Sequence, residues 1–494
     1  MSGAVATAVS ELASEQGVFI DGQWTSGAAG SFHVDDPATG VPIATVANGA
    51  ASDGVAAVDA ASAAFPAWRA LPARERSEVL RRCFELMVRD TDRLSDLIAV
   101  ENGKPRADAR SEVLYAAEFF RWFAEEAVRT DGSYGAAPAG GTRTIVTHRP
   151  VGVAALVTPW NFPAAMATRK IAPALAAGCT VVLKPAAETP LTALALARLM
   201  TEAGVPHGVV NIVPTTHAAL VVTAWLEDPR VRKVSFTGST RVGRLLLHQA
   251  ADRVVNTSME LGGNAPFIVT DDADVDAAVA GAMIAKLRNG GQACTAANRF
   301  YVHELVVAEF ATKLGRKVAA LSVGAAADPS TQIGPLISRA AVDRVGRLVD
   351  SAVACGARIT HRAELPPDST GYFYSPTVLR DVPADAQIVQ DEIFAPVAPI
   401  VTWSDEGELL RMVNTSELGL AAYVYTRDLQ RAVRLGEAID AGMVGINRGI
   451  VSDPSTPFGG LKQSGLGREG ARVGLEAFQE TQYLSIDWPE EGPQ

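Results

Sequence analysis

The sequence predicts an α/β protein with a doubly wound parallel sheet, a second α/β block and a small β arm. The main observation is a set of continuous apolar runs without polar alternation, which is typical of strands buried on both faces of a parallel sheet. Helical stretches separate these runs, giving strand–helix–strand units of about 25–30 residues with right-handed parallel crossovers. The runs lie at residues 151–157, 180–184, 208–213 and 231–236.

The elements around this sheet follow from local patterns. Residues 1–20 are rich in Ala and Ser and are expected to form a loose extension. Residues 52–127 are expected to be helical, because apolar residues recur there at spacings of three and four. A further helix is predicted over residues 189–203, with Thr189 as its N-cap and Pro190 at its first position.

A second α/β block begins near residue 265. Its predicted strands lie at 265–270, 397–402, 421–425 and 443–446, and its helices at 275–287, 305–320 and 339–354. Residues 132–150 are Gly- and Ala-rich and then alternate like a strand, so we expect an excursion that pairs with residues 482–488. The chain is therefore divided into a first domain (1–131 and 151–259), a second domain (260–470) and an arm (132–150 and 471–494).

Composition and charge exclude several classes of protein. The chain of 494 residues has 44 Lys+Arg and 55 Asp+Glu, and the formal net charge of −11 argues against nucleic-acid binding. The sequence has no apolar run long enough to span a membrane and no signal-peptide pattern at its start. Its four cysteines lack paired spacing, so we expect no disulfides and a cytoplasmic location. None of its seven histidines has zinc-type spacing, so we expect no protein-bound metal.

Small polar residues follow three of the predicted strands, at the sheet edge where open α/β sheets bind ligands. Asn161, in Thr158–Pro163, offers an amide donor or is a turn residue. Two interpretations of Lys184 are open: it faces an anionic ligand near the start of the next helix, or it is a solvated lysine at the end of a strand. In the segment 236–240, Gly238 lets the backbone approach a ligand and Ser239 caps the following helix.

The fourth segment carries reactive groups. Glu260 precedes two glycines, and Cys294 follows a Gly-Gly-Gln loop with small and polar neighbours. The other cysteines, Cys83, Cys179 and Cys355, stand in apolar contexts typical of small buried residues. A nucleophilic thiolate needs access and nearby donors, so Cys294 is the candidate nucleophile.

Taken together and in order, the four segments resemble the aldehyde dehydrogenase superfamily over residues 19–483. The segments D-E-I-F-A-P-V, N-T-S-E-L-G-L-A-A and P-F-G-G-L-K-Q-S-G-L-G-R-E-G match as well, at 391–397, 414–422 and 457–470. Residues 160–170 and 445–454 are most similar to the succinate-semialdehyde dehydrogenases of that superfamily. The resemblance implies a dinucleotide-binding domain, a catalytic domain and an oligomerisation arm, although the G-x-G-x-x-G fingerprint is absent.

The resemblance also implies an activity. Cys294 matches the family nucleophile, which forms a thiohemiacetal and then a thioester with the aldehyde carbon. Asn161 and the backbone N–H of Cys294 match the oxyanion donors, and Glu260 matches the residue that activates the hydrolytic water. The expected reaction is oxidation of succinate semialdehyde to succinate.

The cofactor is expected to be NADP, with NAD possible. By resemblance, Glu392 holds the nicotinamide ribose. The other expected cofactor contacts are Trp160, Lys184, Gly238 and Ser239. The residue three after Lys184 is Ala187, where NAD-preferring members often have Glu, although Glu188 follows directly.

The expected substrate contacts are Arg169, Arg288 and Ser452. Planar guanidinium groups suit a carboxylate, so a short semialdehyde with a distal carboxylate fits if both arginines face the tunnel. The alternative is that both arginines form structural ion pairs. Ala296 stands where some relatives have a second cysteine, so no regulatory disulfide is expected there.

Other functions remain open at this stage. One alternative is a dehydrogenase for glutarate semialdehyde or a neutral aldehyde, and another is a CoA-acylating enzyme, which the retained Glu260 disfavours. A catalytically silent cofactor-binding protein is disfavoured because Cys294, Glu260 and Asn161 are all present. An arm strand that leaves its domain needs an edge to pair with, so a homodimer or homotetramer is expected.

Overall fold

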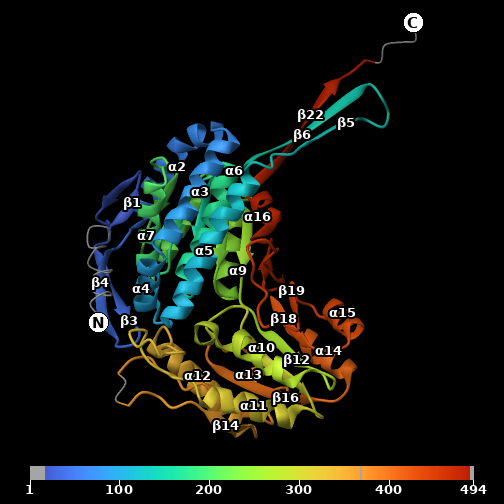
Figure 1. Cartoon of the computed structure of the whole chain (residues 1–494). Helices are drawn as coiled ribbons and strands as arrows, with labels where there is room; N and C mark the ends of the chain where they lie inside the picture. The colour runs from blue at the N-terminus through green and yellow to red at the C-terminus, as the bar shows by residue number, and fades with distance from the viewer. Residues whose placement is uncertain (1–16, 368–369, 490–494) are drawn as a thin grey trace.

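The computed structural model describes residues 17–367 and 370–489 and contains two large sheets (Figure 1). The first sheet has eight strands in the order β2-β1-β9-β8-β7-β10-β11-β21. Their bounds are Val18–Ile20 (β1), Gln23–Thr25 (β2), Val153–Val157 (β7), Thr180–Lys184 (β8), Val210–Ile212 (β9), Val231–Thr237 (β10), Asn256–Glu260 (β11) and Gly465–Leu466 (β21).

The centre of this sheet is parallel, as its unalternating apolar strands predict. β9, β8, β7, β10 and β11 pair in parallel with their neighbours. The chain runs from β7 outward through β8 to β9 and then returns to the other side of β7 with β10. This reversal makes the sheet doubly wound, and the switch point lies between β7 and β10.

Helices cover the sheet. The crossovers are α6 (Pro163–Ala177), α7 (Pro190–Glu202), α8 (Ala218–Glu227) and α9 (Thr240–Ala251). The predicted helical region is confirmed as α2 (Ala51–Ala70), α3 (Ala73–Arg89), α4 (Thr91–Asn102) and α5 (Arg106–Ala127). A core of buried side chains that includes Phe119, Phe120 and Phe123 packs these helices against the strands. A hairpin of β3 (Ser31–Asp36) and β4 (Val41–Ala47) precedes α2.

The second sheet has the order β14-β15-β16-β13-β12-β18-β19, parallel except for β14 against β15. Its strands are Arg358–Arg362 (β14), Thr377–Arg380 (β15), Val397–Trp403 (β16), Ala297–His303 (β13), Ala265–Val269 (β12), Ala421–Tyr425 (β18) and Met443–Ile446 (β19). Its helices are Val275–Leu287 (α10), Val307–Ala319 (α11), Arg339–Ala354 (α12), Gln387–Gln390 (α13), Glu406–Asn414 (α14) and Leu429–Ala438 (α15), and Ala471–Glu476 (α16) precedes the arm. A small pair joins β17 (Leu418–Gly419) to β20 (Leu461–Lys462).

The arm is a three-stranded sheet that projects from the body (Figure 1). β6 (Thr142–Pro150) pairs antiparallel with β5 (Ser133–Ala136) on one side and with β22 (Gln479–Asp487) on the other. The predicted pairing of the excursion with the last strand is confirmed, and that strand begins earlier than predicted.

Two expectations about elements change. The loose extension ends before Val18, where β1 begins, because β1 pairs with β2 and β9; residues 1–16 and 490–494 lie outside the described part of the chain. Thr189 stands at the N-cap position of α7 but does not cap the helix. Instead, the buried Glu101 carboxylate accepts hydrogen bonds from Leu191 N at 2.8 Å and Thr192 N at 3.0 Å. These N–H groups are therefore not open to a ligand, so the start of α7 adds no anion-binding donors beside Lys184.

In residues 17–367 and 370–489, no helix is both long and apolar enough to cross a membrane.

Candidate active site

Four of the predicted site residues meet at one edge of the first sheet. Asn161 follows β7, Lys184 ends β8, Gly238 follows β10 and Glu260 ends β11. Because these four strands are parallel, their carboxyl ends lie side by side. The edge includes the switch point, where open α/β sheets form a crevice.

The loop that carries Cys294 reaches this edge from the second sheet. It lies between a short 3-10 turn, Arg288–Gly291, and β13. Asn161 Nδ2 donates to Gln292 O at 3.0 Å, which ties the two segments together. Gly263 permits close approach, because a Cβ there would lie 2.3 Å from Cys294 O. The structure thus brings Asn161, Glu260 and Cys294 to one place.

Cys294 differs from the other cysteines in its setting. Its side chain is half-buried, whereas Cys83 and Cys179 are buried as predicted. Cys355 is exposed, which corrects the expectation of an apolar setting: it stands at the C-cap of α12, where the buried face of the helix has ended. Burial raises the pKa of the Cys294 thiol to about 12, and the nearby Arg169 guanidinium opposes this rise.

Glu260 is a buried carboxyl with unused hydrogen-bonding capacity. It is 3% exposed, and its Oε2 has no hydrogen-bond partner in the described structure. Burial raises its pKa well above the ordinary value, and the neighbouring Glu469 raises it further, whereas Lys170 and Arg169 oppose the rise. Gly459 leaves room for Glu260, since a Cβ there would lie 2.9 Å from Glu260 Oε1.

A buried charged cluster that the sequence did not predict lies behind Glu260. Lys170 Nζ donates to Ser235 Oγ at 2.9 Å and also pairs with the Glu469 carboxylate. Arg169 lies 3.6 Å from the same carboxylate. Lys170 and Glu469 are 299 positions apart, so local sequence offers no sign of the pair.

A cavity of about 500 Å³ lies next to the start of the loop that carries Cys294 and is lined by Arg288, Ser452, Tyr115 and Phe162, among others. The Arg288 guanidinium stacks over the Phe162 ring at 4.9 Å. Arg169 is not among the lining residues. It is 2% exposed and donates to the Tyr115 hydroxyl at 2.5 Å. The structure therefore brings Arg288 and Ser452 together and sets Arg169 behind Tyr115.

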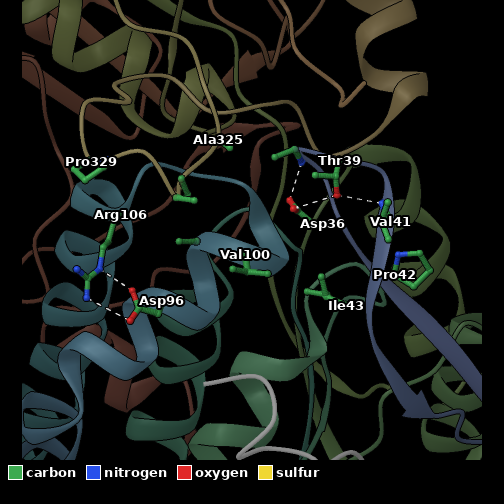
Figure 2. Close-up of a pocket in the computed structure, with 14 residues that line it drawn as sticks. Asp36, Thr39, Val41, Pro42, Ile43, Asp96, Val100, Arg106, Ala325 and Pro329 are labelled. Atoms are coloured by element: carbon green, nitrogen blue, oxygen red, sulfur yellow. Dashed lines mark hydrogen bonds and ion pairs between the residues drawn. The ribbon is translucent and has the colours of Figure 1, made fainter. Parts of the chain in front are cut away.

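A second cavity, of about 480 Å³, lies between the β3–β4 hairpin, α4 and the segment 325–329 (Figure 2). Its charged groups are already paired: Arg106 with Asp96 at 2.6 Å, and Asp36 with the Thr39 hydroxyl at 3.2 Å. None of the predicted site residues lines it. Of these two cavities, only the first is lined by predicted substrate contacts, namely Arg288 and Ser452.

The sequence pattern of the aldehyde dehydrogenase family matches residues 24–484. The chain belongs to the aldehyde dehydrogenase family. It is 52% identical over 449 residues to a succinate-semialdehyde dehydrogenase of Paenarthrobacter nicotinovorans, covering 91% of this chain and 100% of that protein. It is 48% identical over 472 residues to a glutarate-semialdehyde dehydrogenase of Pseudomonas putida, covering 95% of this chain and 98% of that one. The crystal structure of an E. coli NADP-dependent enzyme matches with a TM-score of 0.94 at 48% identity, covering 96% and 98% of the two chains.

An aldehyde dehydrogenase uses a nicotinamide dinucleotide, and the residues at the sheet edge fit one. Lys184 is 8% exposed, and its ammonium has no hydrogen-bond or ion-pair partner in the described structure. A hydroxyl or phosphate oxygen of a ligand would supply the missing hydrogen-bond acceptor. Burial lowers the pKa of Lys184, and Glu188 opposes that change. Ser239 is exposed and caps α9 by accepting from Val242 N at 3.4 Å, which confirms its predicted capping role.

The remaining predicted cofactor residues surround this edge. Glu392 accepts from Gly263 N at 3.2 Å, which places its carboxylate beside the end of β11. Burial raises the pKa of Glu392 to about 7. The Trp160 ring packs edge-on against Phe394 at 5.6 Å. Ala187 is half-buried in the loop after β8, next to the exposed Glu188.

Proposed function

We propose that this aldehyde dehydrogenase oxidises succinate semialdehyde to succinate with NADP, or NAD, as the oxidant. The observation that carries the proposal is the convergence of Cys294, Asn161 and Glu260 beside a cavity lined by Arg288 and Ser452. The succinate-semialdehyde dehydrogenase named above supports the substrate assignment.

The thiolate of Cys294 attacks the aldehyde carbon and forms a thiohemiacetal. Its oxyanion accepts a hydrogen bond from Asn161 Nδ2, whose first hydrogen is held by Gln292 O, and from the Cys294 backbone N–H. When bound, the nicotinamide supplies the hydride acceptor that oxidation to the thioester requires. Glu260 then takes a proton from water as the water oxygen attacks the acyl carbon. The carbon–sulfur bond breaks, which releases the acid and restores the thiolate.

The cofactor would be held by Lys184, Trp160, Gly238, Ser239 and Glu392. Ala187 presents no carboxylate to a 2′-phosphate, which favours NADP. The name of the E. coli NADP-dependent enzyme agrees with this preference.

The substrate carboxylate would bind Arg288, with Ser452 as an additional donor from the same cavity wall. Arg169 contributes positive charge from behind Tyr115. A glutarate semialdehyde is one methylene longer, and the glutarate-semialdehyde dehydrogenase relative makes it the second candidate.

We further propose a homodimer or homotetramer in which the arm pairs with another subunit. Apolar side chains on the arm support this, because Tyr134, Tyr483 and Trp488 are exposed. All four cysteines are free thiols, which supports a cytoplasmic location.

The test compares succinate semialdehyde, glutarate semialdehyde and an uncharged aldehyde of similar length, each with NADP and with NAD. We expect the highest kcat/KM for succinate semialdehyde with NADP. A preference for the uncharged aldehyde would overturn the substrate assignment, and a higher kcat/KM for glutarate semialdehyde would select the second candidate.

A further inference from the structure

A buried ion pair beside the site has no part in the chemistry described above. Lys104 lies between α4 and α5, Glu112 lies in α5, and the two side chains are each 0% exposed with Nζ and Oε2 2.5 Å apart. Burying two charges carries a large desolvation cost, and apolar replacements of such pairs are often neutral or stabilising. The presence of this ion pair is therefore weak evidence that it stabilises the fold. Its contacts suggest a different role.

Both partners hold the segment that carries Asn161. Lys104 Nζ donates to Asn161 O at 2.7 Å and lies 4.1 Å from the centre of the Phe162 ring. Glu112 Oε1 accepts from Ala164 N at 2.9 Å and from Ala165 N at 3.3 Å. These N–H groups open α6, which has no side-chain cap of its own. The pair thus fixes the chain both at Asn161 and just after it.

A second set of contacts joins the same carbonyl to the catalytic loop. Asn289 Nδ2 donates to Asn161 O at 2.8 Å, and Asn289 N donates to Asp108 Oδ2 at 2.8 Å. The Asn161 side chain donates to Gln292 O at 3.0 Å, two residues before Cys294. The Asn161 carbonyl therefore accepts from both Lys104, which lies between α4 and α5, and Asn289, which lies in the 3-10 turn before Cys294.

We infer that Lys104 and Glu112 form a positioning pair, which acts through Asn161 by fixing its amide relative to Cys294. The inference rests on the proposed role of Asn161 as an oxyanion donor. Such donors work only when they are preorganised, and a displacement of about 1 Å can cost roughly a hundredfold in rate.

Glu112→Gln tests the inference, and Glu101→Gln is its matched control. Glu101 is also a fully buried carboxylate that accepts from two N–H groups at a helix start, but it serves α7 and does not contact Asn161. We expect Glu112→Gln to lower kcat by about ten- to a hundredfold with KM changed by less than about threefold. We expect Glu101→Gln to lower the melting temperature while leaving kcat within about twofold.

The decisive comparison repeats Glu112→Gln in an Asn161→Ala background. If Glu112 acts through the Asn161 amide, Asn161→Ala has already removed the effect that Glu112 supports. Adding Glu112→Gln is then expected to lower kcat by less than about twofold. The same loss in both backgrounds would show that the pair is merely structural and would overturn the inference.

Asn289→Gly provides a second variant that breaks no ion pair. Asn289 has a φ of 52°, which glycine adopts without strain, so the variant removes the donor and keeps the backbone. We expect the same loss of kcat and the same non-additivity with Asn161→Ala. The assay uses whichever aldehyde the parent oxidises in a Cys294-dependent manner, so failure of the succinate semialdehyde assignment leaves this test valid.

Discussion

Glu260 has to be ionised to act as a base, yet burial and Glu469 favour its neutral form, whereas Lys170 favours the carboxylate. Because its pKa is raised, Glu260 becomes a carboxylate only at a higher pH than an ordinary glutamate does. We therefore expect thioester hydrolysis to accelerate with pH beyond the range in which an ordinary glutamate titrates. Lys170→Met removes a positive neighbour, so it is expected to move this rise to higher pH. The rate of single-turnover hydrolysis of the acyl-enzyme, measured against pH, gives this rise in the parent protein and in Lys170→Met. The same pH dependence in the two proteins would contradict the role given to Lys170.

The two arginines are expected to differ, because only Arg288 lines the cavity. A charge-assisted hydrogen bond is worth about 1.5–3 kcal/mol, so Arg288→Leu is expected to raise KM for succinate semialdehyde about ten- to a hundredfold. KM for an uncharged aldehyde is expected to change little. Arg169 pairs with Glu469 and lies near Cys294, so Arg169→Leu is expected to lower kcat for both aldehydes. Steady-state kinetics on both substrates measure this, and equal losses for the two aldehydes in Arg288→Leu would make Arg288 structural.

At the scale of residues, the sequence predicted the groups that break a local pattern. Cys294 and Asn161 stand out because small polar residues interrupt apolar runs. Lys170 and Tyr115 do not stand out, because each acquires its role from a partner that only the fold brings near. Arg169 was predicted as a substrate contact from the family resemblance and from the fit of a guanidinium to a carboxylate. In the structure it contacts Tyr115 and Glu469 and does not line the cavity.

Among the elements, α7 shows how a distant side chain replaces a local one. Burial raises the pKa of Glu101 from its ordinary value of 4.5 to about 8. Between these values the folded chain holds a proton that the unfolded chain has lost, so this contribution to stability is lost as pH rises through the window. The slope is at most about 1.4 kcal/mol per pH unit. We expect Glu101→Gln to flatten the decline of unfolding free energy with pH, measured by denaturant titration, and parallel pH curves would contradict it.

The predicted elements succeed where an apolar run is unbroken and fail where the pattern is short or interrupted. Strands β7 and β8 are built on continuous apolar runs, so both their existence and their parallel pairing follow from burial on two faces. The seven-residue strand β13 was missed because Asn298 and Arg299 interrupt its apolar pattern. β17, β20 and β21 have two residues each, too few for any periodicity, and depend on contacts from distant parts of the chain. The cap of α7 was misassigned because Glu101 is 90 positions from Leu191.

For the molecule as a whole, the projecting arm is where apolar side chains of the last strand are exposed. Leu484 is 47% exposed on β22, beside the more exposed Tyr483. If the arm pairs with another subunit, Leu484→Asp is expected to shift the protein toward monomers at micromolar concentration. Ser485→Asp adds the same charge to the same strand without removing an apolar side chain and is expected to keep the oligomer. Light scattering measures both, and a monomeric parent protein would refute the proposal.

The proposed mechanism requires that Cys294 forms a thioester with the substrate and that Glu260 activates the water that hydrolyses it. The most direct measurement mixes Glu260→Gln with succinate semialdehyde and NADP, follows the burst of reduced cofactor, and locates the acyl group by mass spectrometry of the peptides. We predict one equivalent of reduced cofactor per site, followed by a stall with a succinyl adduct on Cys294. The double variant with Cys294→Ala is predicted to show neither burst nor adduct. Absence of the burst in Glu260→Gln, or an adduct on any other residue, would contradict the account.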